Sequence, residues 1–309
     1  MKILVVGAGA MGSLFGGRLK EKGFDVALVD VWVEHIEKVN SDGLLIQGEN
    51  KKDIIQIAAK FAEDMEGKAD LIILFTKTFH TPKAIESILH LVHENTMIIT
   101  IQNGLNNARL IQSFFNENQI IVGVTNVPSD LIGPGYVKSV GSGETRLMML
   151  NQTVPKELKK IVKMFNEAGF QCSTHTDIYP YIWEKVAFNC SLNCLATITA
   201  LEVGFLGELK EGRNLAFKVV EEILDIAIKK GIKVNRVRVR SLVSEAFVKY
   251  ASHKPSMLQD VLNRKQTEVD SLNGAVIKEA KQLNMKVPVT ETFYELIKII
   301  EKTRDERVY

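Results

Sequence analysis

Short apolar runs alternate with helical segments over residues 1–125 of the chain. The apolar runs are rich in valine, isoleucine and leucine, and we interpret them as buried strands. They are Ile3–Val6, Val26–Val29, Leu71–Phe75, Met97–Ile101 and Ile120–Val124. Segments with a helical period lie between them, at Gly12–Lys22, Pro82–Leu91 and Ala108–Phe115. Strands that alternate with helices predict crossover connections and a parallel sheet that is covered on both faces.

Residues 126–150 carry a different pattern, in which glycine-rich turns separate short strand-like runs. Tyr136–Val140 lies between two such turns, and Thr145–Leu150 follows the second of them. The simplest interpretation is an antiparallel extension of the same sheet.

The strand signal disappears after Pro180, and the remaining segments have a helical period. These segments are Tyr181–Leu201, Leu209–Lys230, Arg236–Tyr250, Met257–Leu262, Glu268–Leu283 and Val289–Lys302. The sequence therefore predicts an α/β protein with two domains. A doubly wound, mainly parallel sheet occupies residues 1–177, and an all-helical domain occupies residues 178–309.

Composition narrows the classes of partner. The chain of 309 residues is 46% hydrophobic and 25% charged, and 39 basic against 37 acidic side chains give a net charge of +2. A nearly neutral chain gives no electrostatic reason to expect nucleic acid or a membrane surface as a partner. Three cysteines without framework spacing and the lack of a long apolar window favour a cytoplasmic protein. No histidine or cysteine pair has metal-ligand spacing, so we expect no metal site.

A glycine-rich turn, GAGAMG at residues 7–12, directly follows the first strand and opens the first helix. Gly7 permits the tight turn, Gly9 lets the backbone approach a pyrophosphate, and Gly12 allows close packing of helix on strand. Phosphates then bind the free amides at the helix N-terminus. The motif predicts a Rossmann-type dinucleotide site made by Gly7, Ala8, Gly9, Ala10, Met11 and Gly12. A tight turn without a ligand is the alternative.

Asp30 ends the second strand and points to one type of cofactor. A carboxylate at this place accepts hydrogen bonds from the ribose hydroxyls and repels a 2′-phosphate. The residues that follow, Val31–Val33, include no arginine or lysine for such a phosphate. Asp30 therefore favours NAD(H) over NADP(H). The alternatives are that Asp30 caps the next helix, or that a distant basic residue serves the phosphate.

Two polar residues follow later strands of the same sheet. Lys77 comes after Leu71–Phe75, and Asn103 comes after Met97–Ile101. Ligands of open parallel sheets bind at the carboxyl ends of the strands. We therefore expect Lys77 to reach the cofactor and the Asn103 amide to lie beside the nicotinamide. For each residue, a place in a solvated loop is the alternative.

A polar stripe runs along an otherwise apolar helix in residues 183–200, WEKVAFNCSLNCLATITA. Lys185, Asn189 and Asn193 are spaced i, i+4, i+8 and lie within about 80° of one another around the helix. Burial of a lysine and two asparagines without partners is costly, so the stripe predicts a polar cleft. The alternative is an asparagine ladder between two helices, with Lys185 reaching into solvent.

Two further polar residues have ordinary structural interpretations. Ser256 stands at a capping position before a predicted helix. Thr267 and Asp270 resemble a cap pair, which places Glu268 in a first helical turn as a surface carboxylate that compensates the helix dipole.

Several motifs then occur together and in one order. They are GAGAMG at residues 7–12, FTK ending at Lys77, QNGL from Gln102, WEKVAFNCSLN over 183–193, PSMLQD over 255–260 and TEVDSLNGAV over 267–276. With them the chain resembles the ketopantoate reductase (2-dehydropantoate 2-reductase) family over nearly its whole length. The resemblance implies reduction of a 2-oxo acid, most directly 2-dehydropantoate to (R)-pantoate, with NADP(H). It also implies a small-molecule substrate and a possible homodimer.

The resemblance assigns roles residue by residue. Lys185 matches the family's catalytic lysine, Asn103 the amide near nicotinamide and lysine, and Glu268 the acidic residue at the substrate. The remaining matches are Asn189, Asn193 and Ser256 at substrate-binding positions and Lys77 at a cofactor-contacting position.

Asp30 departs from the family pattern, which carries a basic residue after the second strand for NADPH. The segment Asp30–Trp32, followed by His35–Glu37, looks like the NAD-dependent D-2-hydroxyacid dehydrogenase branch, which includes mandelate-type enzymes. A dehydrogenase acting on branched or aromatic 2-oxo acids is therefore an alternative. A dinucleotide-binding regulator without turnover is an alternative of another class.

Overall fold

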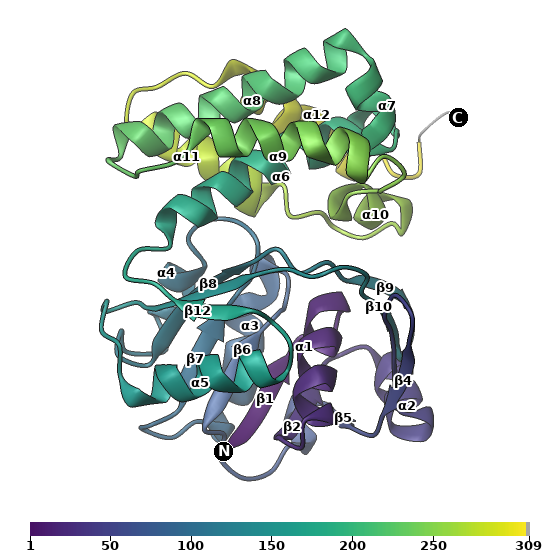
Figure 1. The fold of residues 1–309 in the computed structure, drawn as a ribbon, viewed down its shortest axis with the longest axis vertical. Coiled ribbons are helices and arrows are strands. Elements are labelled where there is room, and N and C mark those ends of the chain that lie inside the picture. Colours follow the sequence, from purple (N-terminus) through teal and green to yellow (C-terminus); the bar gives the residue numbers. More distant parts are fainter. Residues whose placement is uncertain (307–309) are drawn as a thin grey trace. The chain divides into compact units, whose positions relative to one another are not determined.

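The computed structural model describes residues 1–306, and the chain divides into two compact units (Figure 1). The first unit contains Met1–Gln102 and Asn107–Ile178. The second contains the chain from Tyr179 onward together with the short segment Asn103–Asn106. A loop that follows a strand of the first unit therefore belongs structurally to the second.

An eight-stranded sheet forms the centre of the first unit, with the order β12–β11–β8–β7–β6–β1–β2–β5. Its strands are β1 (Lys2–Val6), β2 (Asp25–Val29), β5 (Ala58–Lys60), β6 (Leu71–Leu74), β7 (Met97–Thr100), β8 (Ile120–Thr125), β11 (Thr145–Met149) and β12 (Cys172–Thr174). From β5 to β8 in this order all neighbours are parallel, whereas β11 is antiparallel to β8. The chain winds outward from β1 in both directions, which confirms the predicted doubly wound α/β sheet.

Helices cover both faces of this sheet (Figure 1). They are α1 (Ala10–Glu21), α2 (Val33–Asp42), α3 (Thr81–Ile88), α4 (Asn107–Ile111) and α5 (Lys156–Glu167), with short 3-10 turns at Ala62–Asp64, Thr78–His80 and Leu89–Leu91. Phe15 of α1 stacks on Phe170, with ring centroids 3.8 Å apart, and meets the edge of Phe165 of α5. This aromatic cluster fixes α1, and with it the glycine-rich turn, against the sheet.

A second, four-stranded sheet corrects one prediction. Its order is β4–β3–β10–β9, with β3 (Leu44–Gln47), β4 (Lys52–Ile55), β9 (Asp130–Gly133) and β10 (Tyr136–Lys138). The predicted extension of the main sheet is right for β11 and wrong for Tyr136–Val140, because β10 pairs with β3 and β9 instead. The reason lies at Gly135, which has a φ of 66° and whose carbonyl accepts the Leu45 N–H, so the chain turns toward β3.

The described part of the second unit is built of helices around one apolar core. The helices are α6 (Tyr179–Thr199), α7 (Val203–Glu208), α8 (Lys210–Lys229), α9 (Arg236–Lys249), α10 (Ser256–Leu262), α11 (Ala275–Gln282) and α12 (Pro288–Lys302). The predicted all-helical character is confirmed. The segment predicted as one helix over Glu268–Leu283 differs, because it contains a π-helical turn at Asp270–Gly274 before α11. Such turns are rare and are frequent at functional sites.

A buried carboxylate ties α6 to α9. Glu184 is 5% exposed and accepts two hydrogen bonds from Arg238, from Nε at 2.8 Å and from Nη2 at 2.7 Å. It also accepts the backbone N–H of Asn235 at 2.8 Å, at the start of α9. The Arg238 guanidinium in turn lies over the Tyr181 ring, 5.0 Å from its centroid.

Removal of this carboxylate is expected to destabilise the second unit. Glu184→Ala should lower the free energy of unfolding by about 2 kcal/mol, because charge-assisted hydrogen bonds are lost and an N–H loses its partner. Urea unfolding measures this as a lower midpoint with an unchanged slope. The control is Glu245→Ala, which removes an exposed ion pair with Lys249 and should cost about 0.5 kcal/mol or less. Equal effects of the two variants would contradict a holding role for Glu184.

Candidate active site

The glycine-rich turn joins β1 to α1, and its three glycines have different surroundings. Gly7 has a φ of 93°, and a Cβ on it would lie 2.6 Å from the Thr76 nitrogen. A Cβ on Gly12 would lie 1.9 Å from the Gly7 carbonyl oxygen, whereas one on Gly9 would meet no atom within 4 Å. Gly7 and Gly12 are therefore required by packing, and Gly9 leaves open space in front of the helix.

The start of α1 suits an anion. Ala10 and Met11 open the helix, and its first turn carries no acidic side chain. The backbone N–H groups and the dipole at a helix N-terminus favour negative charge. The open space at Gly9 and this uncompensated N-terminus together fit the pyrophosphate of a dinucleotide.

Asp30 lies beside this turn at the end of β2. One of its carboxylate oxygens accepts the Ala8 N–H, and the other accepts those of Val31 at 2.7 Å and Trp32 at 3.0 Å. Helix α2 begins after Trp32 and receives no side-chain cap, so Asp30 is not a helix cap. Three amides instead fix the carboxylate next to the turn.

A buried histidine links the turn to the second sheet, and the sequence did not reveal this role. The Gly135 N–H donates to Nδ1 of His35 at 3.2 Å, so the proton of the neutral ring lies on Nε2, which is 3.2 Å from the Ser13 Oγ. Ser13 Oγ donates in turn to the Ala8 carbonyl at 2.7 Å. Burial lowers the pKa of His35, and the charge of Asp30 opposes this lowering. The Trp32 ring stacks on His35, with centroids 5.3 Å apart.

Lys77 lies at the same edge of the sheet as the glycine-rich turn. It directly follows Thr76, the residue whose backbone packs against Gly7. Gln102, at the end of the neighbouring β7, has a structural role, because its Nε2 donates to the Thr76 carbonyl at 2.6 Å and to Thr81 Oγ1 at 2.7 Å. The carboxyl ends of β1, β2 and β6 thus bring together the turn, Asp30 and Lys77.

In the second unit, the polar stripe lies on one uninterrupted helix, as predicted. Helix α6 runs over Tyr179–Thr199, so Lys185, Asn189 and Asn193 share one face. Asn193 is 6% exposed, and the other two side chains are half-buried. Within residues 1–306, the side-chain amides of Asn189 and Asn193 make no hydrogen bond to protein atoms, so no asparagine ladder forms. Their hydrogen-bonding groups remain available for a ligand.

Glu268 is buried at 7% exposure, so the expectation of a surface carboxylate is wrong. Its negative charge acts on Lys185. Burial lowers the pKa of Lys185 to about 8 from its usual 10.5, and the Glu268 carboxylate opposes this lowering. At neutral pH the amine is therefore mainly protonated but gives up its proton far more readily than an exposed lysine.

The loop that carries Asn103 packs against the segment that carries Glu268. Gly104 has a φ of 93°, and a Cβ there would lie 2.4 Å from the Ser271 carbonyl oxygen. The Leu105 N–H donates to this same oxygen at 3.1 Å, and the Ser271 N–H donates to the Glu268 carbonyl at 3.1 Å. One glycine thus allows Asn103 and Glu268 to be held within the same small part of the second unit.

Ser256 is the exposed first residue of α10, and Pro255 occupies the cap position, so Ser256 does not cap the helix. The next residue, Met257, contacts the Cys194 thiol, with the two sulfurs 3.7 Å apart. Cys194 follows Asn193 on α6, so α10 begins beside one end of the polar stripe.

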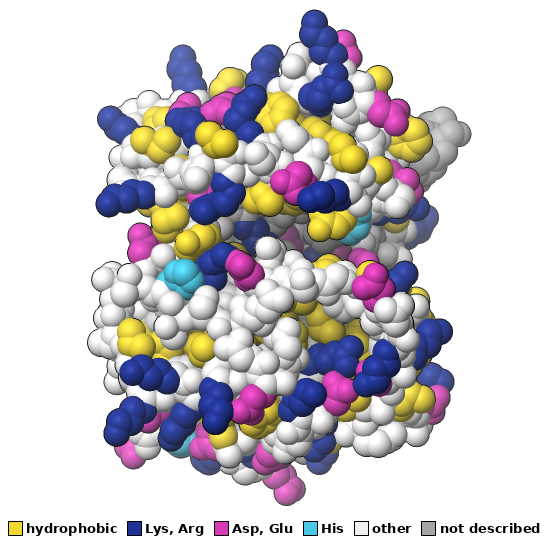
Figure 2. Space-filling model, in the orientation of Figure 1, with side chains coloured by type: hydrophobic (Ala, Val, Ile, Leu, Met, Phe, Trp, Pro, Cys, Tyr) yellow, Lys and Arg dark blue, Asp and Glu magenta, His cyan; other side chains and the backbone are white. Residues whose placement is uncertain are grey.

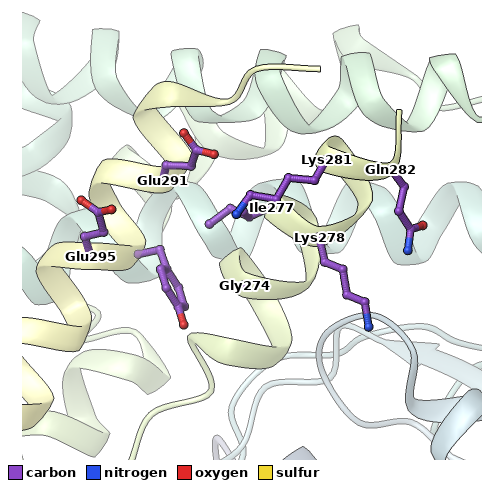
Figure 3. Close-up of a pocket in the computed structure, with 8 residues that line it drawn as sticks. Gly274, Ile277, Lys278, Lys281, Gln282, Glu291 and Glu295 are labelled. Carbon is purple, nitrogen blue, oxygen red and sulfur yellow. The ribbon is translucent and has the colours of Figure 1, made fainter. Parts of the chain in front are cut away.

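A hollow of about 610 Å³ lies elsewhere in the second unit, between α11 and α12 (Figure 3). Its lining is Gly274, Ile277, Lys278, Lys281, Gln282, Glu291, Tyr294 and Glu295. None of the candidate catalytic, substrate-binding or cofactor-binding residues named from the sequence lines this hollow. Its lysines and glutamates are of equal number, so the hollow presents no net charge that would select a ligand.

The described residues were also compared with the geometry of a metal site and of a membrane-spanning helix. Among residues 1–306, no group of three or more histidine, cysteine, aspartate or glutamate side chains fits a metal ion. Over the same residues, no helix is both long and apolar enough to cross a bilayer. Figure 2 shows basic and acidic side chains interspersed over the visible face.

Stability should depend on pH through His35. Unfolded His35 takes up a proton near pH 6.5, whereas burial lowers the pKa of the folded ring, and a second ring proton would also face the Gly135 N–H. The free energy of unfolding is therefore expected to fall as the pH is lowered from about 7 to 5. His35→Gln should flatten this dependence in urea unfolding, and the exposed-site control His253→Gln should keep it. If the free energy of unfolding of His35→Gln depended on pH as strongly as that of the wild type, His35 would not be the source of the pH dependence.

Comparisons with known proteins agree over almost the whole chain. The family description "Ketopantoate reductase PanE/ApbA" matches residues 3–152, and "Ketopantoate reductase PanE/ApbA C terminal" matches residues 177–301. The 2-dehydropantoate 2-reductase of Pyrococcus abyssi is 33% identical over 298 residues, which cover 96% of this chain and 97% of the relative.

Two solved structures, which bear different enzyme names, share the fold of this chain over almost its whole length. A structure of D-mandelate dehydrogenase with NADH and anilino(oxo)acetate is 30% identical, has a TM-score of 0.94, and the match covers 99% of this chain and 100% of that one. The 2-dehydropantoate 2-reductase of Geobacter metallireducens is 25% identical with a TM-score of 0.90, and the match covers 97% of this chain and 99% of that one. The chain therefore belongs to the ketopantoate reductase family, whose members are oxidoreductases that use a nicotinamide cofactor.

Proposed function

We propose that the protein reduces 2-dehydropantoate to (R)-pantoate, with Lys185 as the proton donor. The proposal rests mainly on one feature of the second unit: the charge of the buried Glu268 acts on Lys185. Lys185 lies on the face of α6 that also carries Asn189 and Asn193, whose side-chain amides make no hydrogen bond to protein atoms among residues 1–306. A protonated amine with a pKa of about 8 suits proton donation at neutral pH.

The first unit fits the cofactor that this reaction requires. The residues of the glycine-rich turn, Gly7, Ala8, Gly9, Ala10, Met11 and Gly12, would hold the pyrophosphate, with Lys77 and Asp30 at the same edge of the sheet. The bound nicotinamide supplies the hydride. The Asp30 carboxylate would accept hydrogen bonds from ribose hydroxyls and repel a 2′-phosphate, which supports NAD(H) as the preferred form.

The residues of the second unit supply charge stabilisation and the proton. Negative charge develops on the substrate carbonyl oxygen, and the Lys185 ammonium stabilises this charge and then donates its proton to the oxygen. The Glu268 carboxylate keeps the lysine charged before the reaction, because it opposes the effect of burial. After transfer, the same carboxylate favours return of a proton to the amine from solvent.

The remaining polar side chains would orient the substrate. The amides of Asn189 and Asn193 can donate to the substrate carboxylate or accept from its hydroxyl. Ser256 adds a hydroxyl at the start of α10, and Asn103 would keep Lys185 and the nicotinamide in register. Alignment of the reacting groups contributes a large part of the rate by itself.

Loss of the amine is expected to remove turnover and leave dinucleotide binding intact. Lys185→Met should lower kcat by about 10²–10⁴-fold, since the general acid and its charge are lost. Oxidation of NADH or NADPH measures the turnover, and fluorescence titration measures dinucleotide binding. Lys249→Met, on the exposed face of α9, is the control and should behave as the wild type. Wild-type turnover in Lys185→Met would rule out the mechanism.

A D-2-hydroxyacid dehydrogenase that acts with NADH on branched or aromatic 2-oxo acids is the second candidate. Asp30 and the likeness to D-mandelate dehydrogenase with NADH favour it. Values of kcat/KM for 2-dehydropantoate and for branched and aromatic 2-oxo acids, each with both cofactors, distinguish the two candidates. Absence of turnover with every pair would favour a dinucleotide-binding regulator. A homodimer remains a prediction.

Cofactor choice should depend on Asp30. In the wild type, kcat/KM is expected to be about 10-fold or more higher with NADH than with NADPH, because like charges placed side by side cost more than about 1.4 kcal/mol. Asp30→Asn keeps an oxygen acceptor for the neighbouring amides and removes the repulsion of the 2′-phosphate. The ratio of kcat/KM with NADH to kcat/KM with NADPH should therefore fall. Asp25→Asn, at the exposed start of β2, is the control. A preference that Asp30→Asn leaves unchanged would contradict this role.

A further inference from the structure

The residue before Glu268 is fixed to α12 by a buried carboxylate. Thr267 is fully buried, and both its backbone N–H and its hydroxyl donate to Glu301 Oε1, at 2.8 Å and 2.7 Å. The Glu301 side chain is 8% exposed. Thr267 Oγ1 accepts the Val269 N–H at 3.2 Å, as a capping residue does, but Thr267 and Asp270 do not form the predicted reciprocal cap pair, because Glu301 and not Asp270 accepts the Thr267 N–H.

Asp270, two residues after Glu268, is fixed to the same helix. Lys298 Nζ donates to one of its oxygens at 2.9 Å, and the Tyr294 hydroxyl donates to the other at 2.8 Å. Lys298 Nζ also lies 2.8 Å from Glu301 Oε2, so one ammonium joins both attachment points. Tyr294, Lys298 and Glu301 are spaced i, i+4, i+7 and share one face of α12.

The backbone of Glu268 is held between these two points. Its carbonyl accepts the N–H groups of Ser271 at 3.1 Å and Leu272 at 3.0 Å at the start of the π-helical turn. The side chain of Val269 is fully buried. Little backbone freedom is left by which the carboxylate could move away from Lys185.

We propose that Thr267, Asp270, Lys298 and Glu301, the α12 clamp, form a positioning device that holds the Glu268 carboxylate at the place from which its charge acts on the Lys185 ammonium. The inference rests on the proposed function of Lys185 and adds residues that touch neither substrate nor cofactor. A purely structural network would stabilise the second unit without affecting the ionisation of Lys185.

The charges of the clamp distinguish positioning from a direct electrostatic effect. If Glu301 acted on Lys185 through space, Glu301→Gln and Glu301→Ala would lower the pKa of Lys185 alike, and Lys298→Met would raise it. If the clamp positions Glu268, Glu301→Gln keeps the acceptor for Thr267 and preserves the pKa. Glu301→Ala removes the attachment of Thr267, and Lys298→Met removes one attachment of Asp270. Both variants should then lower the pKa of Lys185, because Glu268 is released.

The test measures the ionisation of Lys185 without substrate or cofactor. Trace labelling of the intact protein with acetic anhydride over a pH series, read by mass spectrometry at Lys185, gives the titration midpoint. The midpoint is expected near 8 in the wild type and in Glu301→Gln. In Glu301→Ala and Lys298→Met, we expect the midpoint to be lower by about 0.5 pH unit or more. Glu245→Ala, which breaks an exposed ion pair on α9, is the control and should leave it unchanged.

The outcomes test the clamp and the proposed function separately. A wild-type midpoint in folded Glu301→Ala, or a raised midpoint in Lys298→Met, overturns the clamp. If Glu301→Ala does not fold, Lys298→Met still decides the question, because it keeps the bond between Thr267 and Glu301. Shifted midpoints without turnover of any 2-oxo acid by the wild type would support the clamp and refute the proposed function. If the wild type does turn over a 2-oxo acid, the alkaline limb of its pH profile of kcat/KM should shift in each variant by as much as the labelling midpoint of Lys185 shifts.

Discussion

A lysine ammonium in a largely apolar helix is the constraint on which the second unit depends. Burial penalises the charge of Lys185, and the opposite charge of Glu268 reduces that penalty enough for the pKa to remain near 8. The two residues are far apart in the chain, so the pair exists only because α6 and the π-helical turn pack into the same core. The chemistry proposed for this chain depends on that packing.

The first unit achieves rigidity at its ligand turn in a comparable way. The Asp30 carboxylate accepts the N–H of Ala8, and the Ser13 hydroxyl donates to its carbonyl, so side chains hold both backbone polar groups of this residue. His35 then connects Ser13 to the second sheet. A turn that is already held in its final shape loses less entropy when a dinucleotide binds.

The loop at Asn103–Asn106 shows how a parallel sheet contributes to a helical unit. Strand β7 ends at the carboxyl edge of the sheet, and the residues that follow leave the first unit and pack on Ser271. Gly104 makes this possible, because any side chain there would overlap the Ser271 carbonyl. The position of Asn103 therefore depends on a backbone contact that no local pattern indicates.

Local patterns in the sequence were enough to predict the elements with strong signals. Buried strands, helical periods, the glycine-rich turn and the face shared by Lys185, Asn189 and Asn193 all follow from repeats within a few residues. Which partners those elements meet depends on the packing of the whole unit, as in the pairing of β10 with β3, the burial of Glu268 and the hydrogen bonds around His35. Periodicity reports which side of an element is apolar, but a hydrogen bond or ion pair between distant residues depends on the packing of the whole domain.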